Sequence, residues 1–494
     1  MANDYRFVFD EAVIKAGSLK RAAREVDIAD GTHAETELKL ANQRGCRDKT
    51  SFRRGMLDSG LRRRSRAAGG HIECVDGTIG AFIVEGICLS THLLCVGGDD
   101  HDLRIPFLLA LTKHGFRVAA AGTGDPAPFR HAGLDYRAIN FDRFVNPMAD
   151  WTAIKALSRV LADVRAELVQ SFDTKPNLLV PLAARGFRNM SVVRTINGLG
   201  WIYSSRSPMA LTLAPVYRAL HRLAARSTAL TVFQNRDDKI FFEQHGMLGG
   251  GAGRLIPGSG IDVERFEQAA TGGPAPSALR ESLGLGTSEV VVTVTRITRQ
   301  KGIRTLLEAA ALVHQARPGV RFLLVGPRQG EGPMAVPQAE IDRHAPYVIA
   351  PGRRSDIPAL LGIADVFAFP TEYREGVPRC LLEAALAGLP IVTTRMPGCC
   401  DVVHDGWSGL LVPPRAPQLL AARILDLLRD RDTARVMGAR ARELVKEEFN
   451  LEITVARYAA LYEELVDRGF RGTEQRAQGE MPVPGKQGSA AKRV

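Results

Sequence analysis

Two cationic side chains follow an apolar run in the second half of the chain. The run VTVTRITRQKG has Arg296 directly after a Val-rich stretch and Lys301 five positions later, followed by Gly302. Short Val-rich runs predict strands that are buried on both faces, and the residues after Gly302 have the period of a helix. Two cations beside a helix start suit a diphosphate, because they neutralise its negative charge. An Arg and a Lys at a strand end can equally be exposed to solvent.

A pair of glutamates supplies a second signal. The run TEYREGVPRCLLEAALAGLPIV contains Glu375 and Glu383 with seven residues between them. The preceding VFAFP predicts a strand, so Glu375 and Gly376 fall on a loop at the carboxyl edge of a sheet, before a helix whose first N–H groups can bind an anion. Gly376 lets a sugar or phosphate approach the backbone closely. Glu383, more than one turn into the helix, offers two acceptor oxygens to a vicinal diol such as that of a ribose.

These residues are positioned by elements that alternate between strand and helix. From Leu93 onward, the apolar runs THLLCV, FRVAAAG, LVQSF, SVVRTI and ALTVFQN are separated by segments of helix length, and the pattern restarts after GGGAGRLIPGSGID with VVVTVTR, RFLLVG, YVIAPG, VFAFP and PIVTT. Alternation of this kind predicts parallel sheets covered by helices. The fold class is therefore α/β, with two Rossmann-like doubly wound domains facing across a cleft, where ligands bind at the carboxyl ends of the strands.

The pattern divides the chain into five segments. They are an uncharacterised, poorly ordered extension (1–86), a first Rossmann-like domain (87–255), a second Rossmann-like domain (256–445), a helix that packs back towards the first domain (446–466) and a disordered tail (467–494).

Composition limits the class of protein. With 45% hydrophobic and 24% charged residues among 494, the chain is typical of soluble globular proteins of about two domains. The net charge of +11 favours anionic partners, but much of the excess lies in the Arg-rich stretch before residue 67 and in the tail, so we do not infer nucleic-acid binding. The seven cysteines form no C-x-x-C pair, and no signal peptide or spanning segment is evident. We expect a cytoplasmic protein.

In this order, the motifs resemble the retaining GT-B glycosyltransferases of family four, also called group 1, in the branch that builds bacterial exopolysaccharide, capsule or O-antigen. The resemblance covers about Leu93 to Val466 and rests on IPGSGID, TRITRQKG, the glutamate pair and PGCCDVVHDGWSGLLVPP. It implies an acceptor-side domain at 87–255 and a nucleotide-sugar-binding domain at 256–445. It also implies that no metal or other cofactor is required.

The resemblance carries over residue by residue. It implies that Arg296 and Lys301 hold the donor diphosphate, that Glu375 lies against the donor sugar, and that Glu383 binds the nucleotide ribose. These first three would be the catalytic residues, with Glu375 positioning and polarising rather than acting as a covalent nucleophile. The remaining donor-binding positions that it implies are Gly97, Gly98, Ser259, Gly260, Gly376 and Val377.

Two departures from the family pattern stand out. Many members carry a His where TINGLGW has Asn197, and an amide cannot take a proton near neutral pH. Cys400 and Asp401 stand where relatives often carry Arg and Glu. On the acceptor side, the resemblance points to Lys175, Asn197 and Trp201.

A helical segment, APVYRALHRLAARS, adds a possible acceptor surface. It sets Arg218, Arg222 and Arg226 four residues apart, opposite Val216 and Leu220. This amphipathic pattern fits peripheral contact with an anionic membrane or a carrier-lipid diphosphate, and equally fits an ordinary domain helix with a solvated basic face.

We therefore expect a hexosyl or N-acetylhexosaminyl transferase that uses a nucleotide diphosphate sugar, with UDP favoured, and a lipid-linked or polysaccharide acceptor at the inner face of the cytoplasmic membrane. A GT-B nucleotide-sugar epimerase and a non-catalytic nucleotide-sugar-binding protein remain alternatives. Neither the sugar nor the linkage follows from these motifs, because a few contacts fix such specificity.

Overall fold

The computed structural model describes residues 91–98, 100–142, 146–187, 189–205, 207–248, 252–329 and 331–479. The expected extension at 1–86 and the last part of the expected tail, 480–494, lie outside these ranges. The chain from Ser90 onward forms one compact unit.

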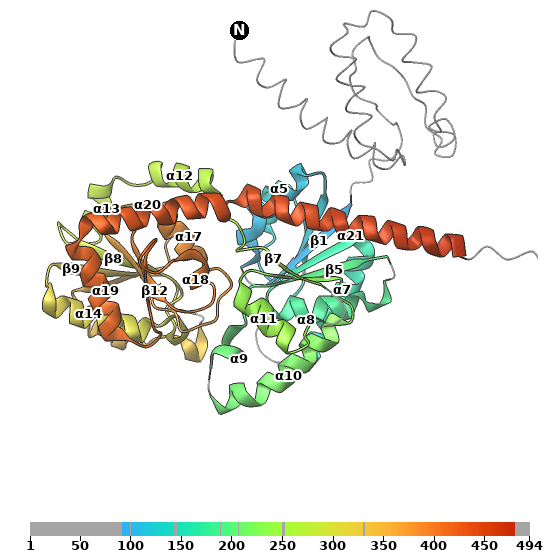
Figure 1. The fold of residues 1–494 in the computed structure, drawn as a ribbon, viewed down its shortest axis with the longest axis horizontal. Coiled ribbons are helices and arrows are strands. Elements are labelled where there is room, and N and C mark those ends of the chain that lie inside the picture. Colours follow the sequence, from blue (N-terminus) through green and yellow to red (C-terminus); the bar gives the residue numbers. More distant parts are fainter. Residues whose placement is uncertain are drawn as a thin grey trace, which may run out of the picture. The chain divides into compact units, whose positions relative to one another are not determined.

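The first half of this unit contains a seven-stranded parallel sheet with the order β3-β2-β1-β4-β5-β6-β7. Figure 1 labels β1, β5 and β7 of this sheet. Its strands are β1 (His92–Gly97), β2 (Arg117–Gly122), β3 (Asp135–Ala138), β4 (Leu168–Phe172), β5 (Ser191–Ile196), β6 (Leu230–Phe233) and β7 (Ala252–Leu255). Its α-helices are α5 (Ile105–Lys113), α6 (Ala127–His131), α7 (Pro147–Val164), α8 (Thr174–Ala183), α9 (Gly200–Ser204), α10 (Pro208–Ala225) and α11 (Arg236–Gln244), with short 3-10 turns at His101–Arg104 and Ala184–Gly186.

The second half contains a six-stranded parallel sheet with the order β10-β9-β8-β11-β12-β13. Its strands are β8 (Glu289–Val294), β9 (Val320–Val325), β10 (Val348–Gly352), β11 (Val366–Phe369), β12 (Ile391–Thr394) and β13 (Leu410–Val412). Its α-helices are α12 (Val263–Thr271), α13 (Pro276–Ser282), α14 (Ile303–Ala316), α15 (Gln338–Asp342), α16 (Ile357–Gly362), α17 (Arg379–Leu386), α18 (Cys399–Val402), α19 (Pro417–Arg429) and α20 (Arg431–Glu448), with 3-10 turns at Arg299–Lys301 and Gly332–Met334.

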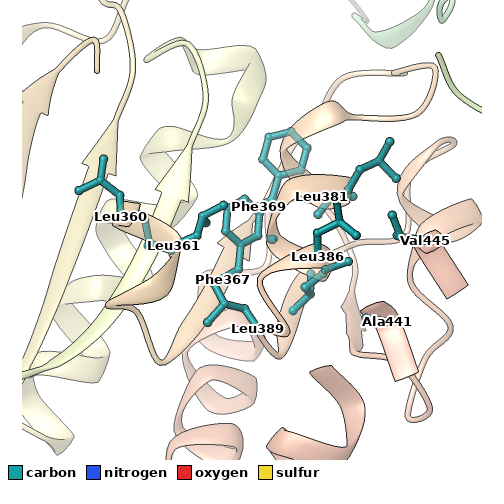
Figure 2. Packing of buried hydrophobic residues seen from close by; sticks show 14 of the residues in the cluster. Leu360, Leu361, Phe367, Phe369, Leu381, Leu386, Leu389, Ala441 and Val445 are labelled. Atoms are coloured by element: carbon teal, nitrogen blue, oxygen red, sulfur yellow. The ribbon is translucent and has the colours of Figure 1, made fainter. Parts of the chain in front are cut away.

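Helices cover both faces of each sheet, which is why the central strands are largely apolar. Along β1, Leu93 and Cys95 point to one core, and Leu94 and Val96 to the other, as the two-residue period of a strand requires. In the second sheet, Phe367 of β11 packs with the helices α17 and α20 (Figure 2). Each large apolar side chain buried in this way contributes about 1.5–3 kcal/mol relative to exposure.

The last helix returns to the first sheet. Helix α21 (Leu451–Gly479) packs its apolar side chains into the core formed by β1, β4 and α5. Two buried tyrosines fix it by hydrogen bonds: the hydroxyl of Tyr458 lies 3.0 Å from Oγ1 of Thr195, and that of Tyr462 donates to Oε1 of Gln170 at 2.9 Å.

All ten predicted strands are confirmed, and the fold class with them. Three short strands, β3, β7 and β13, were not predicted. The predicted bounds of the last helix differ from those observed: α20 continues to Glu448, and α21 starts at Leu451, where Oδ1 of Asn450 accepts the N–H of Glu452. Residues 467–479, predicted to be disordered, continue α21, in keeping with their Glu, Gln, Arg and Ala content.

Candidate active site

The candidate residues lie at the two points where strand order reverses. In the first sheet the reversal falls between β1 and β4, and in the second between β8 and β11. At such a point the loops after the two strands diverge, which leaves room for a ligand at the carboxyl edge. Gly97 ends β1 and Gly98 follows it, Arg296 and Lys301 follow β8, and Glu375 follows β11.

Lys301 and Glu375 form the centre of the C-terminal half of the site. Their side chains make an ion pair through Nζ and Oε1, and only 11% and 14% of these side chains is exposed. Thr371 Oγ1 donates a second hydrogen bond to the same carboxylate oxygen at 3.2 Å. The ammonium group also lies 5.6 Å from the ring centres of Phe369 and Tyr373. The cation therefore fixes the carboxylate in an environment that is largely shielded from water.

Arg296 and Glu383 flank this pair but bind other side chains. Arg296 forms an ion pair with Glu331 at 3.2 Å, and Glu383 accepts a hydrogen bond from Arg379 at 2.9 Å. Lys301 and Glu375 are thus in direct contact with each other, whereas Arg296 and Glu383 each bind a separate partner.

Three of these charged side chains influence the pKa of the Cys380 thiol. Burial raises the pKa of Cys380 well above its ordinary value, and the charges of Lys301, Glu375 and Glu383 act on the same thiol. Glu375 lies in the loop before α17, and Glu383 lies in the middle of that helix.

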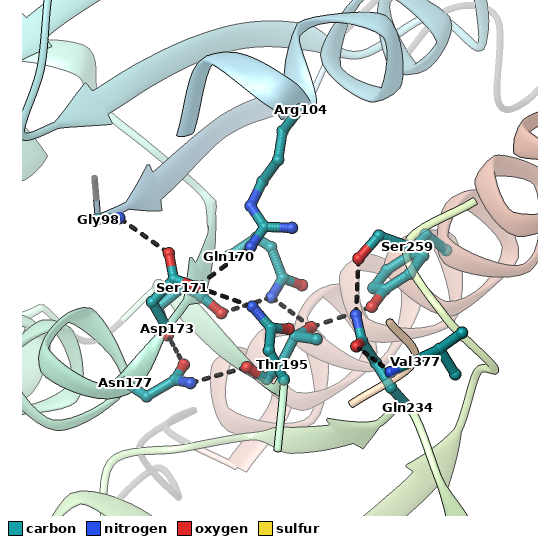
Figure 3. Close-up of polar contacts among 12 residues, drawn as sticks. Gly98, Arg104, Gln170, Ser171, Asp173, Asn177, Thr195, Gln234, Ser259 and Val377 are labelled. Carbon is teal, nitrogen blue, oxygen red and sulfur yellow. Dashed lines mark hydrogen bonds and ion pairs between the residues drawn. The ribbon is translucent and has the colours of Figure 1, made fainter. Parts of the chain in front are cut away.

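In the N-terminal half, Asp173 organises the glycine-rich loop (Figure 3). Its carboxylate accepts the N–H of Gly98 at 2.9 Å, an amide hydrogen of Asn197 at 2.9 Å and a guanidinium hydrogen of Arg104 at 3.2 Å. Burial alone would raise the pKa of Asp173, but these three groups outweigh that effect and hold it below the ordinary 3.8. Asp173 is therefore a carboxylate at neutral pH.

A neutral histidine underlies the same loop. His101 is fully buried and stacks on Phe129 with 5.3 Å between ring centres. Burial, reinforced by the charge of Arg104, lowers the pKa of His101 to about 3. This ring packs so closely under Gly97 that a Cβ there would lie 2.1 Å from Nδ1.

The loop at Glu375 touches the N-terminal half directly. The N–H of Gly376 donates to the carbonyl of Asn197 at 2.9 Å, and the N–H of Val377 to Oε1 of Gln234 at 3.3 Å (Figure 3 shows the latter bond). Asn235 Nδ2 donates to the carbonyl of Glu375 at 3.0 Å. The backbone groups predicted to meet the donor thus lie against the N-terminal half.

An ion pair reinforces this contact. Nη2 of Arg374 lies 3.0 Å from Oδ1 of Asp238, whose side chain is fully buried. The backbone N–H of Arg374 donates to Ser204 Oγ at 2.8 Å. Burial raises the pKa of Asp238, while the hydrogen bonds from Asn235 and Arg374 lower it again in part.

The other predicted site residues contact different parts of the protein and do not form one group. Ser259 Oγ accepts from Gln234 at 2.7 Å, whereas Gly260 packs against the first turn of α21, with Leu451 Cα 2.9 Å from where a Cβ would be. Lys175 pairs with Asp150 at 2.5 Å. Trp201 lies in α9, between Asn197 and α10.

The predicted basic helix is α10. It packs differently from an ordinary amphipathic helix, whose apolar side chains face the domain. Arg222 donates two hydrogen bonds to the carbonyl of His245, at 2.8 and 3.0 Å, while Arg218 is half-buried. Val216 and Leu220, the apolar side chains expected to face the domain, are exposed.

Sequence reasoning missed Asp173, Arg104, Gln234 and the pair formed by Arg374 and Asp238. Asp173 and Gln234 each follow directly on an apolar strand, β4 and β6, so a polar residue at a strand end was the signal that could have identified them. Nothing local marks the other three, because their roles depend on contacts between distant segments.

Within the described ranges, no group of three or more His, Cys, Asp or Glu residues could hold a metal ion, and no helix is long and apolar enough to span a bilayer. The chemistry available to the site comes from its cations and carboxylates, because the backbone N–H groups of Gly98, Gly376 and Val377 already donate within the protein.

Solved structures share this architecture. Sucrose-phosphate synthase from Thermosynechococcus elongatus matches 76% of this chain and all of its own, at 19% identity and a TM-score of 0.63. HepE of Anabaena, in complex with UDP-glucose, matches 76% of this chain and 99% of its own, at 19% identity and a TM-score of 0.61. Two parallel-sheet domains, each with a reversal in strand order at its centre, define the GT-B fold.

Sequence comparison then gives the family. Residues 288–430 match the family described as "Glycosyl transferases group 1". The GDP-mannose-dependent monoacylated alpha-(1-6)-phosphatidylinositol monomannoside mannosyltransferase of Corynebacterium glutamicum is 30% identical over 65% of this chain and 82% of its own length. The N,N'-diacetylbacillosaminyl-diphospho-undecaprenol alpha-1,3-N-acetylgalactosaminyltransferase of Campylobacter jejuni is 24% identical over 75% of this chain and 97% of its own. The chain belongs to the group 1 glycosyltransferases.

Proposed function

We propose that this protein is a retaining glycosyltransferase that moves a hexose or N-acetylhexosamine from a UDP-sugar to a lipid-linked or polysaccharide acceptor, at the inner face of the cytoplasmic membrane. The observation that carries the proposal is the shielded ion pair of Lys301 and Glu375, which lies beside the N–H of Gly376 where the two halves of the chain meet.

In this mechanism Lys301 and Arg296 stabilise the donor diphosphate. When the bond between the sugar carbon and the phosphate oxygen breaks, the electron pair stays on that oxygen, and a nearby ammonium or guanidinium group lowers the energy of the developing charge. Arg296 is partly exposed and pairs with Glu331 near the surface, so it can turn towards a phosphate with little loss.

Glu375 would orient and polarise the donor sugar. Its carboxylate is held by Lys301 and Thr371, and a group fixed in this way needs no reorganisation during the reaction. In a retaining transfer, the acceptor oxygen forms its bond to the sugar carbon on the face that the phosphate leaves. The leaving phosphate oxygen can accept the acceptor proton, so no side chain needs to act as base.

Asn197 supports this assignment of the proton. Its side-chain amide donates to Asp173, and its backbone carbonyl accepts the N–H of Gly376. Asn197 therefore links the two halves of the chain without a titratable group. Glu383, in the middle of α17, would bind the ribose after giving up its hydrogen bond with Arg379.

Names of relatives support the lipid-linked acceptor and leave the nucleotide divided. Two relatives, from Campylobacter jejuni and Escherichia coli, are named for diphospho-undecaprenol acceptors, and the second for UDP-Gal; the corynebacterial relative is named for GDP-mannose. We favour UDP.

A donor panel tests the proposal. Purified protein is screened by thermal shift with UDP, GDP and ADP, since a ligand at 100 times its Kd raises stability by about 2.7 kcal/mol. UDP-sugars are then incubated with and without membrane lipid extract, and nucleotide release and the anomeric configuration of the product are measured. Release of UDP that needs the extract, with retained configuration, is the expected result. Epimerised UDP-N-acetylglucosamine in the absence of any acceptor would replace the transferase with an epimerase, and binding without turnover would indicate a non-catalytic protein.

A further inference from the structure

Asp173 has a backbone conformation that residues with side chains rarely adopt. It follows β4 directly, and its φ of +67° and ψ of +166° lie in a region that is essentially confined to glycine. Strain of this kind persists only where the surrounding structure holds it, and it is found most often at active sites and ligand clamps. Asp173 lies at such a place, because β4 is one of the two strands at the reversal point of the first sheet.

The carboxylate of Asp173 does not cap the helix that follows it. Asp173 stands immediately before α8, where an aspartate ordinarily accepts an N–H group of the first turn, but it makes no such hydrogen bond. It turns instead towards the loops after β1 and β5, where its three donors are Gly98, Arg104 and Asn197 (Figure 3). The strained backbone therefore directs this carboxylate to the carboxyl edge of the sheet.

The carboxylate keeps room for one more hydrogen bond. Oδ2 accepts the N–H of Gly98, and Oδ1 accepts from Asn197 and Arg104, whereas two carboxylate oxygens offer about four acceptor positions. One third of the Asp173 side chain, 33%, is exposed. A hydroxyl group of a substrate can therefore donate to Oδ2 while the three donors of the protein stay in place.

A second acceptor oxygen lies beside this carboxylate. The side-chain nitrogen of Asn197 donates to Asp173, and within the described part of the chain the buried Oδ1 of Asn197 has no hydrogen-bond partner. Buried polar atoms are nearly always hydrogen-bonded, so an unpaired one marks a place where a ligand can bind. The backbone carbonyl of Asn197 accepts the N–H of Gly376, which brings this pair of acceptor oxygens close to the Glu375 loop.

The charge of Asp173 indicates which substrate group it suits. A diphosphate is repelled by a carboxylate, and the cations assigned to the diphosphate, Arg296 and Lys301, follow β8 in the other half of the chain. A sugar hydroxyl is neutral and has a proton to donate, so it matches a carboxylate oxygen. The group that meets Asp173 is therefore a hydroxyl of a glycan.

We propose that Asp173 is a catalytic residue that accepts a hydrogen bond from the attacking hydroxyl of the glycan acceptor, and so turns a lone pair of that oxygen towards the anomeric carbon of the donor sugar. This role rests on the glycosyl transfer proposed above. The acceptor oxygen forms its bond to the sugar carbon, and the bond from that carbon to the phosphate oxygen breaks with its electron pair on the phosphate. The hydroxyl proton passes to the phosphate oxygen.

Asp173 orients the hydroxyl without removing its proton. Although burial alone would raise the pKa of Asp173, the charge of Arg104 and the hydrogen bonds from Gly98 and Asn197 hold it below the ordinary 3.8. A carboxylate with so low a pKa is a weak base, so it holds the hydroxyl group in one orientation and leaves the proton to the phosphate.

A comparison of transfer with hydrolysis tests this role in D173N. Each UDP-sugar of the donor panel is incubated with the full-length protein, with and without membrane lipid extract, and UDP release is measured. We expect release that depends on the extract to fall at least about 100-fold, as for other fixed groups that act in the transition state. Release without extract uses water, which can present a lone pair in many orientations, and should change less than about threefold. The Kd for UDP should also stay within about threefold.

D365N is the matched control. Asp365 precedes β11 at the amino edge of the second sheet, and 29% of its side chain is exposed. Its carboxylate likewise accepts a backbone N–H, that of Val290, and a guanidinium hydrogen, that of Arg431. D365N therefore loses a similar set of hydrogen bonds away from the site, and both rates should stay within about threefold of the wild type.

D173G guards against a D173N protein that fails to fold. Glycine adopts this backbone conformation without strain, so D173G removes the carboxylate and keeps the turn. We expect D173G to lose transfer as D173N does, with hydrolysis and UDP affinity retained.

Two results would overturn the role of Asp173. The first is transfer by D173N or D173G within about threefold of D365N. The second is an equal loss of transfer and of UDP affinity or hydrolysis, which would make Asp173 a support of the loop after β1. Failure of the proposed function looks different, because the wild type itself would then release no UDP in response to the extract.

Discussion

The side chains of Lys301 and Glu375, 74 positions apart in the chain, form an ion pair at the carboxyl edge of the second sheet. Each follows one of the two central strands, β8 and β11, that flank the reversal in strand order. The pairing gives Glu375 a fixed orientation, and in the proposed mechanism Lys301 is the cation that meets the donor phosphate. The first prediction tests this division of roles.

Replacing Glu375 by Gln should reduce turnover far more than nucleotide binding. The amide keeps the shape but loses the charge that Lys301 and Thr371 hold in place, so we expect kcat to fall about 100- to 1000-fold, as for other fixed electrostatic groups. The Kd for UDP should stay within about threefold, since the carboxylate is assigned to the sugar. The control is E340Q, which removes a carboxylate paired with the exposed Arg304 and should leave both constants unchanged. A larger loss in UDP affinity than in kcat would assign Glu375 to the nucleotide instead.

Arg296 should contribute to diphosphate affinity alone. We expect R296Q to weaken UDP about tenfold, the loss of one charge-assisted contact, and to leave uridine binding unchanged. Isothermal titration with both ligands measures the difference. R423Q, which removes an exposed cation of α19 paired with Asp426, is the matched control. Equal losses for UDP and uridine would show that Arg296 supports the pocket rather than the phosphates.

The loop that carries Glu375 should be sensitive to one neighbouring glycine. Gly398 has φ of +81°, and a Cβ there would lie 1.5 Å from the carbonyl oxygen of Gly376. G398A must therefore displace that loop, and we expect at least about a tenfold loss in kcat, since small misplacements of reacting groups are costly. Gly406 has φ of +74° with nothing within 4 Å, so G406A carries the same backbone strain of about 1 kcal/mol without the collision. Steady-state kinetics of both variants separates strain from displacement, and similar activities would refute the role of the contact.

The alternation of strands and helices could be predicted from the sequence because central strands are apolar on both faces. VVVTV and VFAF are short apolar runs between segments of helix length, a pattern that favours strands buried on both faces. The three missed strands, β3, β7 and β13, all lie at sheet edges. An edge strand pairs on one side only, so segments such as DYRA and AGRL need little apolar character and carry no signal of their own.

For the site too, some residues could be predicted from the sequence and others could not. Arg296, Lys301 and the glutamates stand in local motifs directly after strands and could be found from spacing. Arg374 could not, since its partner lies 136 positions away, and its role appears only when the two halves of the chain are brought together. A sequence also cannot show that Arg296 and Glu383 each have another partner in the absence of a donor.

Asp173 should stabilise the fold in a pH-dependent way. Its pKa is held below the ordinary 3.8, so its contribution is complete above that pH and is lost as pH falls through the lower value of the folded state. We expect D173N to cost about 1–2 kcal/mol at neutral pH, because a carboxylate with three donors becomes an amide. Urea unfolding from pH 7 to pH 3 should show the gap closing as pH drops below 3.8. D135N, at an exposed pair with Arg137, should show neither the cost nor the trend. A cost that persists at the lowest pH would assign the effect to packing.

Arg374 should matter most through the carboxylate that it neutralises. Asp238 is fully buried with a raised pKa, so R374A leaves a charge without its counter-ion, and we expect a loss of about 2 kcal/mol. The double variant R374A/D238N removes that charge and should regain part of the stability, which a double-mutant cycle by urea unfolding measures. The sign with pH follows from the raised pKa: protonation removes the uncompensated charge, so the R374A deficit should be largest at high pH and shrink as pH falls through the pKa of Asp238. Additive losses in the two single variants would show that the ion pair contributes nothing, and that Ser204 and Asn235 suffice to hold the Glu375 loop against the N-terminal half.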